Sequence, residues 1–168
     1  MTTAEHERFQ NLVEDHKKIL YKVCRSYCRN TGDRDDLAQE IIVQLWRSFQ
    51  AFDQRARFST WMYRIALNVA ISFYRRESVR TRHVVPGSEH LLEAIDETRN
   101  RSDEVELLYR WIEELDPLTK ALAILYLDGN SHHEIADILG ISETNVATKI
   151  NRLKQALRQE AGMKLGTR

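Results

Sequence analysis

Residues Phe58 to Arg76 read FSTWMYRIALNVAISFYRR, and this stretch is the clearest guide to the fold of the 168-residue chain. On a helical wheel at about 100° per residue, Met62, Ile65, Val69 and Phe73 share one side, as the core face of a helix would. A neighbouring side carries side chains that a core-facing helix does not need. These are Trp61, Arg64, Asn68, Ser72 and Arg75, with Arg76 next along the chain. The stretch therefore predicts one helix with a buried face and a separate functional face.

The functional face combines three chemistries that suit DNA whose bases have left the duplex. Aromatic rings stack on unpaired bases, arginines neutralise phosphates, and an asparagine amide can bond to a base edge. Trp61 fits two interpretations equally, core packing and direct contact with unpaired DNA.

Helical periodicity extends over most of the remaining chain, and glycine and proline are scarce, which favours helices over sheet. A break is expected at residues 31–33, where Asp33 or Asp35 could cap the next helix. The expected helices of the first half are 9–28, 36–49 and the stretch from Phe58, with a polar connection at 51–56. The predicted fold class is all-α, with two small helical domains joined by an acidic linker.

Residues Ser131 to Leu157 follow the pattern of a helix-turn-helix, with a short apolar helix, a tight turn and a longer second helix. Gly140 suits the left-handed conformation of such a turn, and Ser142 can cap the helix that follows. Side chains that can read base edges in the major groove line the face opposite the apolar stripe of that helix. They are Thr144, Thr148, Asn151, Arg152 and Gln155, with Lys149 beside them to meet a phosphate. A solvated amphipathic helix is the alternative, and the Gly-Ile-Ser turn favours DNA binding.

Formal net charge is zero, but the charges are segregated along the chain. Residues 60–82 hold five arginines and one glutamate, residues 86–116 hold ten acidic and three basic side chains, and residues 142–158 hold four basic and one acidic. Two basic modules therefore flank an acidic segment, a pattern that the overall charge conceals.

Several function classes find no support in the sequence. A polar N-terminus and the lack of a long apolar run predict a cytoplasmic protein without membrane insertion. No nucleophile–base pair or glycine-rich phosphate loop appears, so we expect neither an enzyme nor a cofactor. Cys24 and Cys28 lack further ligands at a recognisable spacing, so we expect buried thiols and no metal site.

Three segments together resemble the extracytoplasmic-function subfamily of bacterial RNA polymerase sigma factors, in the sigma-70 family. They are DRDDLAQEIIVQLWR at 33–47, FSTWMYRIALN at 58–68 and LDPLTKALAILYLDGNSHHEIADILGIS at 115–142, and the basic helix after Ser142 completes the match. The resemblance covers nearly the whole chain in the order and spacing of that family. It implies an alternative sigma factor that binds core polymerase, confers promoter specificity and promotes promoter opening.

The resemblance also assigns a role to each part. The helix from Phe58 would melt and read the minus-ten box, with Asn68 at the pocket for a flipped base, and the helix from Ser142 would read the minus-thirty-five box. The implied docking surface for the clamp helices of the largest polymerase subunit is an acidic helix face. Its residues are Asp35, Asp36, Gln39 and Glu40. An anti-sigma partner is implied by the family alone.

The resulting division is a region 2-like domain at 1–82, a linker at 83–104 and a region 4-like helix-turn-helix domain at 105–168. Two alternatives remain. A dimeric helix-turn-helix repressor of duplex operators would leave the face on the 58–76 helix without a purpose. A redox or metal-sensing protein built around Cys24 and Cys28 would bind zinc or respond to thiol oxidation.

Overall fold

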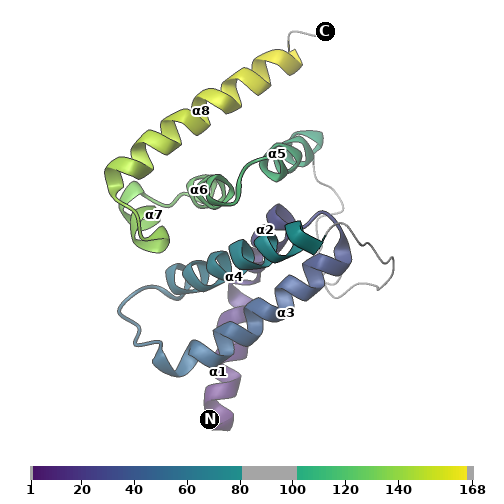
Figure 1. Ribbon diagram of the computed structural model, residues 1–168. Coiled ribbons are helices and arrows are strands. Elements are labelled where there is room, and N and C mark those ends of the chain that lie inside the picture. Colours follow the sequence, from purple (N-terminus) through teal and green to yellow (C-terminus); the bar gives the residue numbers. More distant parts are fainter. Residues whose placement is uncertain (1, 81–101, 166–168) are drawn as a thin grey trace. The chain divides into compact units, whose positions relative to one another are not determined.

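The computed structural model describes residues 2–80 and 102–165, and every regular element within them is a helix (Figure 1). The expected all-α fold is therefore confirmed. Most of the linker expected at 83–104 lies outside the described residues. Contacts divide the chain into two compact units, Met1–Pro117 and Leu118–Arg168.

The N-terminal segment forms two helices where the sequence predicted one over 9–28. Helix α1 (Thr3–Asp15) starts earlier than expected, because the Thr2 side chain and Glu5 form a reciprocal capping box. Helix α2 (Lys17–Tyr27) follows after a break at His16, whose φ and ψ are −113° and 15°. The His16 Nδ1 donates to the Leu12 carbonyl at 2.8 Å. This side-chain bond satisfies a carbonyl at the end of α1 and lets the chain leave the helix there.

Helix α3 (Thr31–Ser48) also begins earlier than the sequence predicted. The cap is Asn30, whose side-chain oxygen accepts the Asp33 N–H at 2.8 Å. The prediction that Asp33 or Asp35 caps this helix is wrong, and the expected break at 31–33 is its first turn. Asparagine is as good a cap as aspartate, so several candidates in one short stretch left the start ambiguous.

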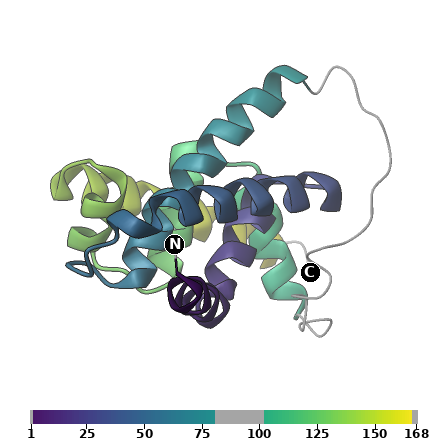
Figure 2. The same ribbon diagram turned by 90° about the horizontal axis from the view of Figure 1, so that it is seen from below.

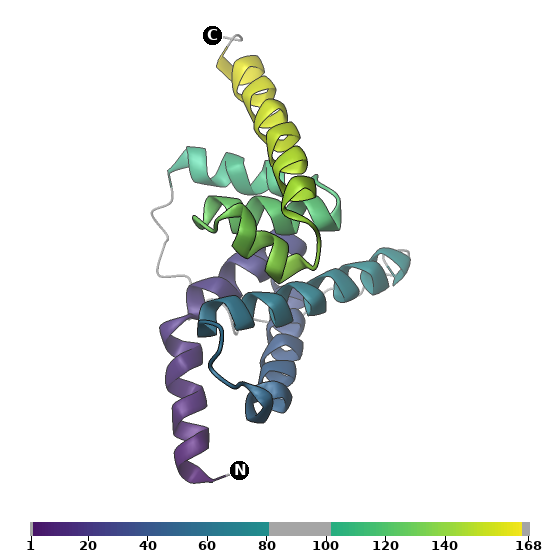
Figure 3. The same ribbon diagram turned by 90° about the vertical axis from the view of Figure 1, so that its left-hand side faces the viewer.

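Helix α4 (Phe58–Arg80) follows the short 3-10 helix η1 (Phe49–Ala51) and a connection in which Gln54 has a φ of 62°. Helices α2, α3 and α4 contact one another pairwise and enclose the core of this unit. The second half of α4 extends past the helices on which it packs (Figures 2 and 3). Fully buried side chains from all three helices fill the centre: Val23, Cys24, Leu37, Ile41, Leu45, Met62, Ala66 and Ala70.

The buried face of α4 is rotated from the predicted stripe. Met62 and Phe73 are buried as expected, but Ile65 and Val69 are only half-buried. Tyr63, Ala66, Leu67 and Ala70 are buried instead. Because two helices, α2 and α3, pack on α4 from different directions, its core face is broader than one row of a helical wheel.

Helix α5 (Asp103–Glu113) contacts α2 and is grouped by its contacts with the first unit. Helices α6 (Pro117–Leu127), α7 (His132–Leu139) and α8 (Glu143–Leu165) follow, and α8 extends well past α7 (Figure 3). Ser131 caps α7 with a capping box to Glu134, and Gly140 ends it in the left-handed conformation at φ 69°. The Ser142 hydroxyl accepts the Asn145 N–H at 3.1 Å at the start of α8. The helix-turn-helix is therefore built as its sequence predicted.

Candidate nucleic-acid interface

The predicted functional face of α4 lies on the surface of the first unit. Asn68, Ser72, Arg75 and Arg76 are exposed, whereas Trp61 and Arg64 are half-buried. Two of the aromatic residues on this helix, Tyr63 and Phe73, are only 2% and 5% exposed, so their rings are not available to stack on bases. The face available to DNA is thus mainly polar and cationic, with one aromatic residue at its start.

Trp61 belongs to an aromatic cluster at the N-terminal end of α4. Its ring centroid lies 4.9 Å from that of Phe52, 5.3 Å from Phe58 and 6.3 Å from Phe49. These tilted and edge contacts hold the indole in place, and its half-buried state leaves part of it accessible. Trp61 is thus packed on one side and partly accessible on the other, and its contact with unpaired DNA stays a prediction.

The predicted polymerase-binding residues lie on the N-terminal half of α3. Asp36, Gln39 and Glu40 are exposed, and Asp35 is half-buried. The Glu40 Oε2 accepts a hydrogen bond from the Arg76 guanidinium of α4 at 2.6 Å. Both side chains are about half exposed, so water screens the pair and its contribution to stability is small.

A groove of about 990 Å³ brings this acidic face and the end of the α4 face together. Its lining includes Asp36, Gln39 and Glu40 from α3, and Val69, Arg75 and Arg76 from α4. The structure therefore joins two sets of residues that the sequence treated as separate surfaces.

The predicted reading face of α8 is open to solvent. Lys149 is half-buried and the other members are exposed: Thr144, Thr148, Asn151, Arg152 and Gln155. The Thr148 hydroxyl donates to the Thr144 carbonyl at 3.0 Å, so it is partly engaged by its own helix. Val146, Ile150 and Leu153 are buried on the opposite face. Helix α8 therefore carries its buried apolar stripe and its predicted reading face on opposite sides.

Two family models match the chain. Residues 12–80 match Sigma-70 region 2, and residues 106–157 match Sigma-70, region 4. The ECF RNA polymerase sigma-E factor of Escherichia coli is 30% identical over 168 residues, covering 92% of this chain and 86% of that protein. The chain belongs to the ECF sigma factors of the sigma-70 family.

Further comparisons agree with this membership. The ECF RNA polymerase sigma factor SigW of Bacillus subtilis is 26% identical over 169 residues, covering 94% of this sigma factor and 90% of SigW. The sigma factor RpoE from Bartonella quintana, solved in complex with the anti-sigma factor NepR, has a similar fold. Its TM-score is 0.70 at 17% identity, over 91% of this chain and 96% of RpoE. The chain therefore acts as a sigma factor in promoter-specific initiation of transcription, a regulatory role that leaves catalysis to the polymerase.

The helix-turn-helix of this sigma factor contains an ion pair that the sequence did not reveal. The His133 Nδ1 lies 2.7 Å from the Glu143 Oε1 and links the first turns of α7 and α8. The hydrogen bond to Glu143 and the charge of that carboxylate raise the pKa of His133 above its usual value of 6.5. The tight turn joins the end of α7 to the start of α8, so it gave no direct signal that the first turns of the two helices would meet.

The cysteines of this sigma factor are buried, with Cys24 0% and Cys28 4% exposed. Burial raises the pKa of the Cys24 thiol well above its usual range, and the nearby Cys28 adds to the shift. A buried thiol that stays protonated reacts slowly. Within residues 2–80 and 102–165, no three histidine, cysteine or acidic side chains gather as metal ligands. No helix among these residues is long and apolar enough to cross a membrane.

Proposed function

We propose that α4 of this sigma factor contacts the melted minus-ten strand, that α8 reads the minus-thirty-five duplex, and that the acidic face of α3 docks on the clamp helices of polymerase. The observation that carries the proposal is the accessibility of the three sets of predicted residues. Most members of each set are exposed while the opposite faces of their helices fill the cores.

The chemistry of the α4 face supports contact with separated strands. Asn68 lies exposed in the middle of α4, where its amide can donate to and accept from one base edge. Arg75 and Arg76 follow at the protruding end, where guanidinium groups can neutralise backbone phosphates. Trp61, held by its cluster, is a rigid surface on which a base can stack.

The chemistry of the α8 face supports duplex reading. Arg152 can bond bidentately to a guanine and Asn151 or Gln155 to an adenine. The Lys154 ammonium lies 5.1 Å from the centre of the Tyr126 ring, so this cation packs on the module itself. Arg152 and Lys149 are then the better candidates for DNA contacts.

The proposed division is a region 2-like domain at 1–82, a linker at 83–104 and a region 4-like domain at 105–168. Its start at 105 agrees with the region 4 match from residue 106, although α5 itself contacts α2. The proposed place of action is the cytoplasm, where the polymerase and chromosome of a bacterium meet, and no catalytic activity is assigned to the chain.

An anti-sigma factor is the remaining proposed partner. RpoE, whose fold is similar to that of this chain, was solved in complex with the anti-sigma factor NepR. An anti-sigma factor would act by covering the exposed faces of α3, α4 or α8.

Run-off transcription with purified core polymerase, with and without the protein, tests the proposal. We expect discrete start sites only with the protein, on promoter fragments of its source organism. A variant that combines Asp36→Ala, Gln39→Ala and Glu40→Ala should lose transcription by losing polymerase binding. If no transcript appears but the protein alone shifts duplex fragments tightly, a repressor replaces this proposal.

A further inference from the structure

We propose that protonated His133 binds a backbone phosphate of the minus-thirty-five duplex while the Glu143 carboxylate positions its ring, so that α8 holds its box more tightly at low pH. The His133 Nδ1 lies 2.7 Å from the Glu143 Oε1, so the carboxylate engages one ring nitrogen. A protonated imidazole carries a second N–H donor, at Nε2. The pair can therefore link the first turn of the reading helix to an anion. This inference rests on the proposed function of α8.

The start of the reading helix is acidic, which is unfavourable next to DNA. Residues 131–146 contain no lysine or arginine and three acidic side chains, Glu134, Asp137 and Glu143. The basic side chains of α8 begin at Lys149, more than one turn after Glu143. Because phosphates repel an uncompensated carboxylate, this end of the helix needs a positive charge if it is to enter a groove. In residues 131–146 only His132 and His133 can supply one.

The place of each partner follows from the way in which a helix-turn-helix docks. The N-terminal residues of the reading helix contact base edges, and the preceding helix crosses the phosphate backbone. Glu143 is the first residue of α8, and His133 lies in the first turn of α7. Their contact therefore lies where the groove meets the backbone. The His133 side chain is 79% exposed and that of Glu143 is 59% exposed, so a phosphate can reach the ring.

The charges around His133 favour its protonated form. The hydrogen bond to Glu143 and the charge of that carboxylate are the main causes that raise the pKa of His133, and Asp137 and Glu134 on α7 act in the same direction. The Glu134 carboxylate accepts the Ser131 N–H at 2.8 Å in the capping box, so Glu143 is the carboxylate that contacts the ring. A phosphate at Nε2 adds another negative charge and raises the pKa further. Duplex binding is therefore coupled to uptake of a proton.

The sign of the pH dependence follows from this coupling. Affinity for the box is highest below the pKa of His133 in the free protein. It falls as pH rises from that pKa to the higher pKa of the DNA-bound form, and it is constant above the second value. One charged contact with a phosphate changes affinity by roughly tenfold and adds about one to the magnitude of the salt slope. The slope should therefore become shallower at high pH, which a purely structural role of the pair would not cause.

Fluorescence anisotropy of a labelled duplex with the minus-thirty-five box tests the proposal in the full-length protein. From about pH 6 to pH 9, a range that spans the titration of a histidine, we expect affinity to fall roughly tenfold. His133→Gln keeps a donor but no charge, so it should bind at every pH as weakly as the parent protein does at high pH. His133→Lys should bind tightly throughout, because its ammonium stays charged up to about pH 10.

The matched control is His132→Gln, which removes the neighbouring histidine from the same turn of α7. We expect this variant to keep the pH dependence of the parent protein. Glu143→Gln should move the transition to lower pH, because the ring loses the carboxylate that favours its charge.

Three results would overturn the proposal. The parent protein could bind with one affinity and one salt slope at every pH, or His132→Gln could abolish the pH dependence as His133→Gln does. The loss in His133→Gln could also be confined to one base pair in a library of upstream boxes, a pattern that belongs to base reading. If the parent protein binds no duplex at any pH, the proposed function of α8 fails and this inference with it, whereas pH-independent binding to the box refutes this inference alone.

Discussion

Asn68 lies exposed at the centre of the α4 face, with Arg64 one turn before it and Ser72 one turn after. If its amide bonds to an unpaired base, Asn68→Ala should reduce discrimination at one position of the minus-ten box by about 1–3 kcal/mol. Polymerase binding should be unchanged, because Asn68 does not line the groove that the acidic face of α3 shares with α4. Run-off transcription on promoters with each base at each position measures the first effect, and competition for core polymerase measures the second. Loss of polymerase binding would contradict a role in base recognition.

Arg152 and Lys149 are neighbouring cations on α8 and form a matched pair. If Arg152 reads a base, Arg152→Ala should cost about 1–3 kcal/mol at one base pair of the minus-thirty-five box and relax specificity there. Lys149→Ala should instead weaken binding equally for all sequences, as loss of a phosphate contact does. Transcription from a library of upstream boxes separates the two patterns. A uniform loss with Arg152→Ala would make Arg152 a phosphate contact.

His133 provides a pH-dependent contact in the helix-turn-helix. Because Glu143 raises the pKa of His133 in the folded state, the pair stabilises the fold fully below the unfolded pKa near 6.5. This contribution is lost as pH rises through the higher folded pKa. We expect NMR titration of the imidazole to give a pKa above 6.5, and Glu143→Gln to lower it towards that value. An unchanged pKa in Glu143→Gln would rule out the contact in solution.

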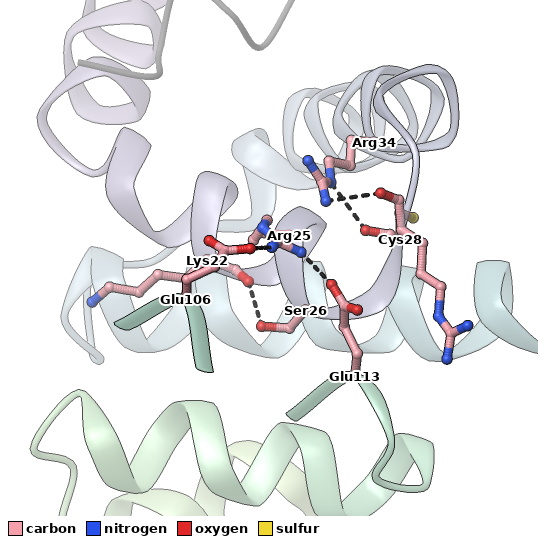
Figure 4. A network of polar contacts seen from close by, with 8 residues as sticks. Lys22, Arg25, Ser26, Cys28, Arg34, Glu106 and Glu113 are labelled. Carbon is pink, nitrogen blue, oxygen red and sulfur yellow. Dashed lines mark hydrogen bonds and ion pairs between the residues drawn. The ribbon is translucent and has the colours of Figure 1, made fainter. Parts of the chain in front are cut away.

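At the scale of the elements, local signals predicted the C-terminal module well and the N-terminal unit less well. The limits of α7 and the start of α8 depend on Ser131, Gly140 and Ser142, which lie next to the helices that they limit. The start of α3 and the break at His16 involve competing local partners, so several boundaries fitted the sequence. The ion pairs of Arg25 with Glu106 and Glu113 (Figure 4) could not be predicted, because these partners lie 81 and 88 residues away.

Helical periodicity alone could not explain why the predicted functional face of α4 is accessible. Two packing partners, α2 and α3, widen the buried face and take Tyr63 and Leu67 into the core. The polar side chains between Arg64 and Arg76 stay outside. Whether these side chains contact DNA stays a prediction.

The turn between α7 and α8 leads into the predicted reading helix, and its contribution to stability can be tested at Gly140. Gly140 has a φ of 69°, and a Cβ added there would meet nothing within 4 Å. Gly140→Ala should therefore destabilise the module by roughly 1–2 kcal/mol through backbone strain alone. Gly162, within α8 and equally unhindered, is the control, because alanine in a helix is favoured over glycine by up to about 1 kcal/mol. Urea unfolding followed by circular dichroism should show opposite shifts. Equal shifts would contradict the strain at Gly140.

At the scale of the whole molecule, the neutral net charge conceals small basic segments. The segment 142–158 carries four basic and one acidic side chain, and Lys154 packs on Tyr126 within the same unit. Few counterions are released by such a surface, so electrostatic affinity for DNA is low. Tight promoter binding therefore requires both modules and the polymerase together, which makes recognition depend on assembly of the holoenzyme.

This dependence can be measured on the protein without polymerase. We expect a labelled duplex carrying the minus-thirty-five box to bind the free chain with a Kd of about 10⁻⁴–10⁻⁶ M. Two or three phosphate contacts would give a slope of about −2 to −3 for log affinity against log salt concentration. Fluorescence anisotropy between 50 and 200 mM salt provides both values, and Lys149→Ala should make the slope shallower by about one. Nanomolar binding, or a slope steeper than about −6, would mean that the free chain contacts DNA through more surface than α8 offers. Strand separation alone would then have to explain why the protein needs polymerase.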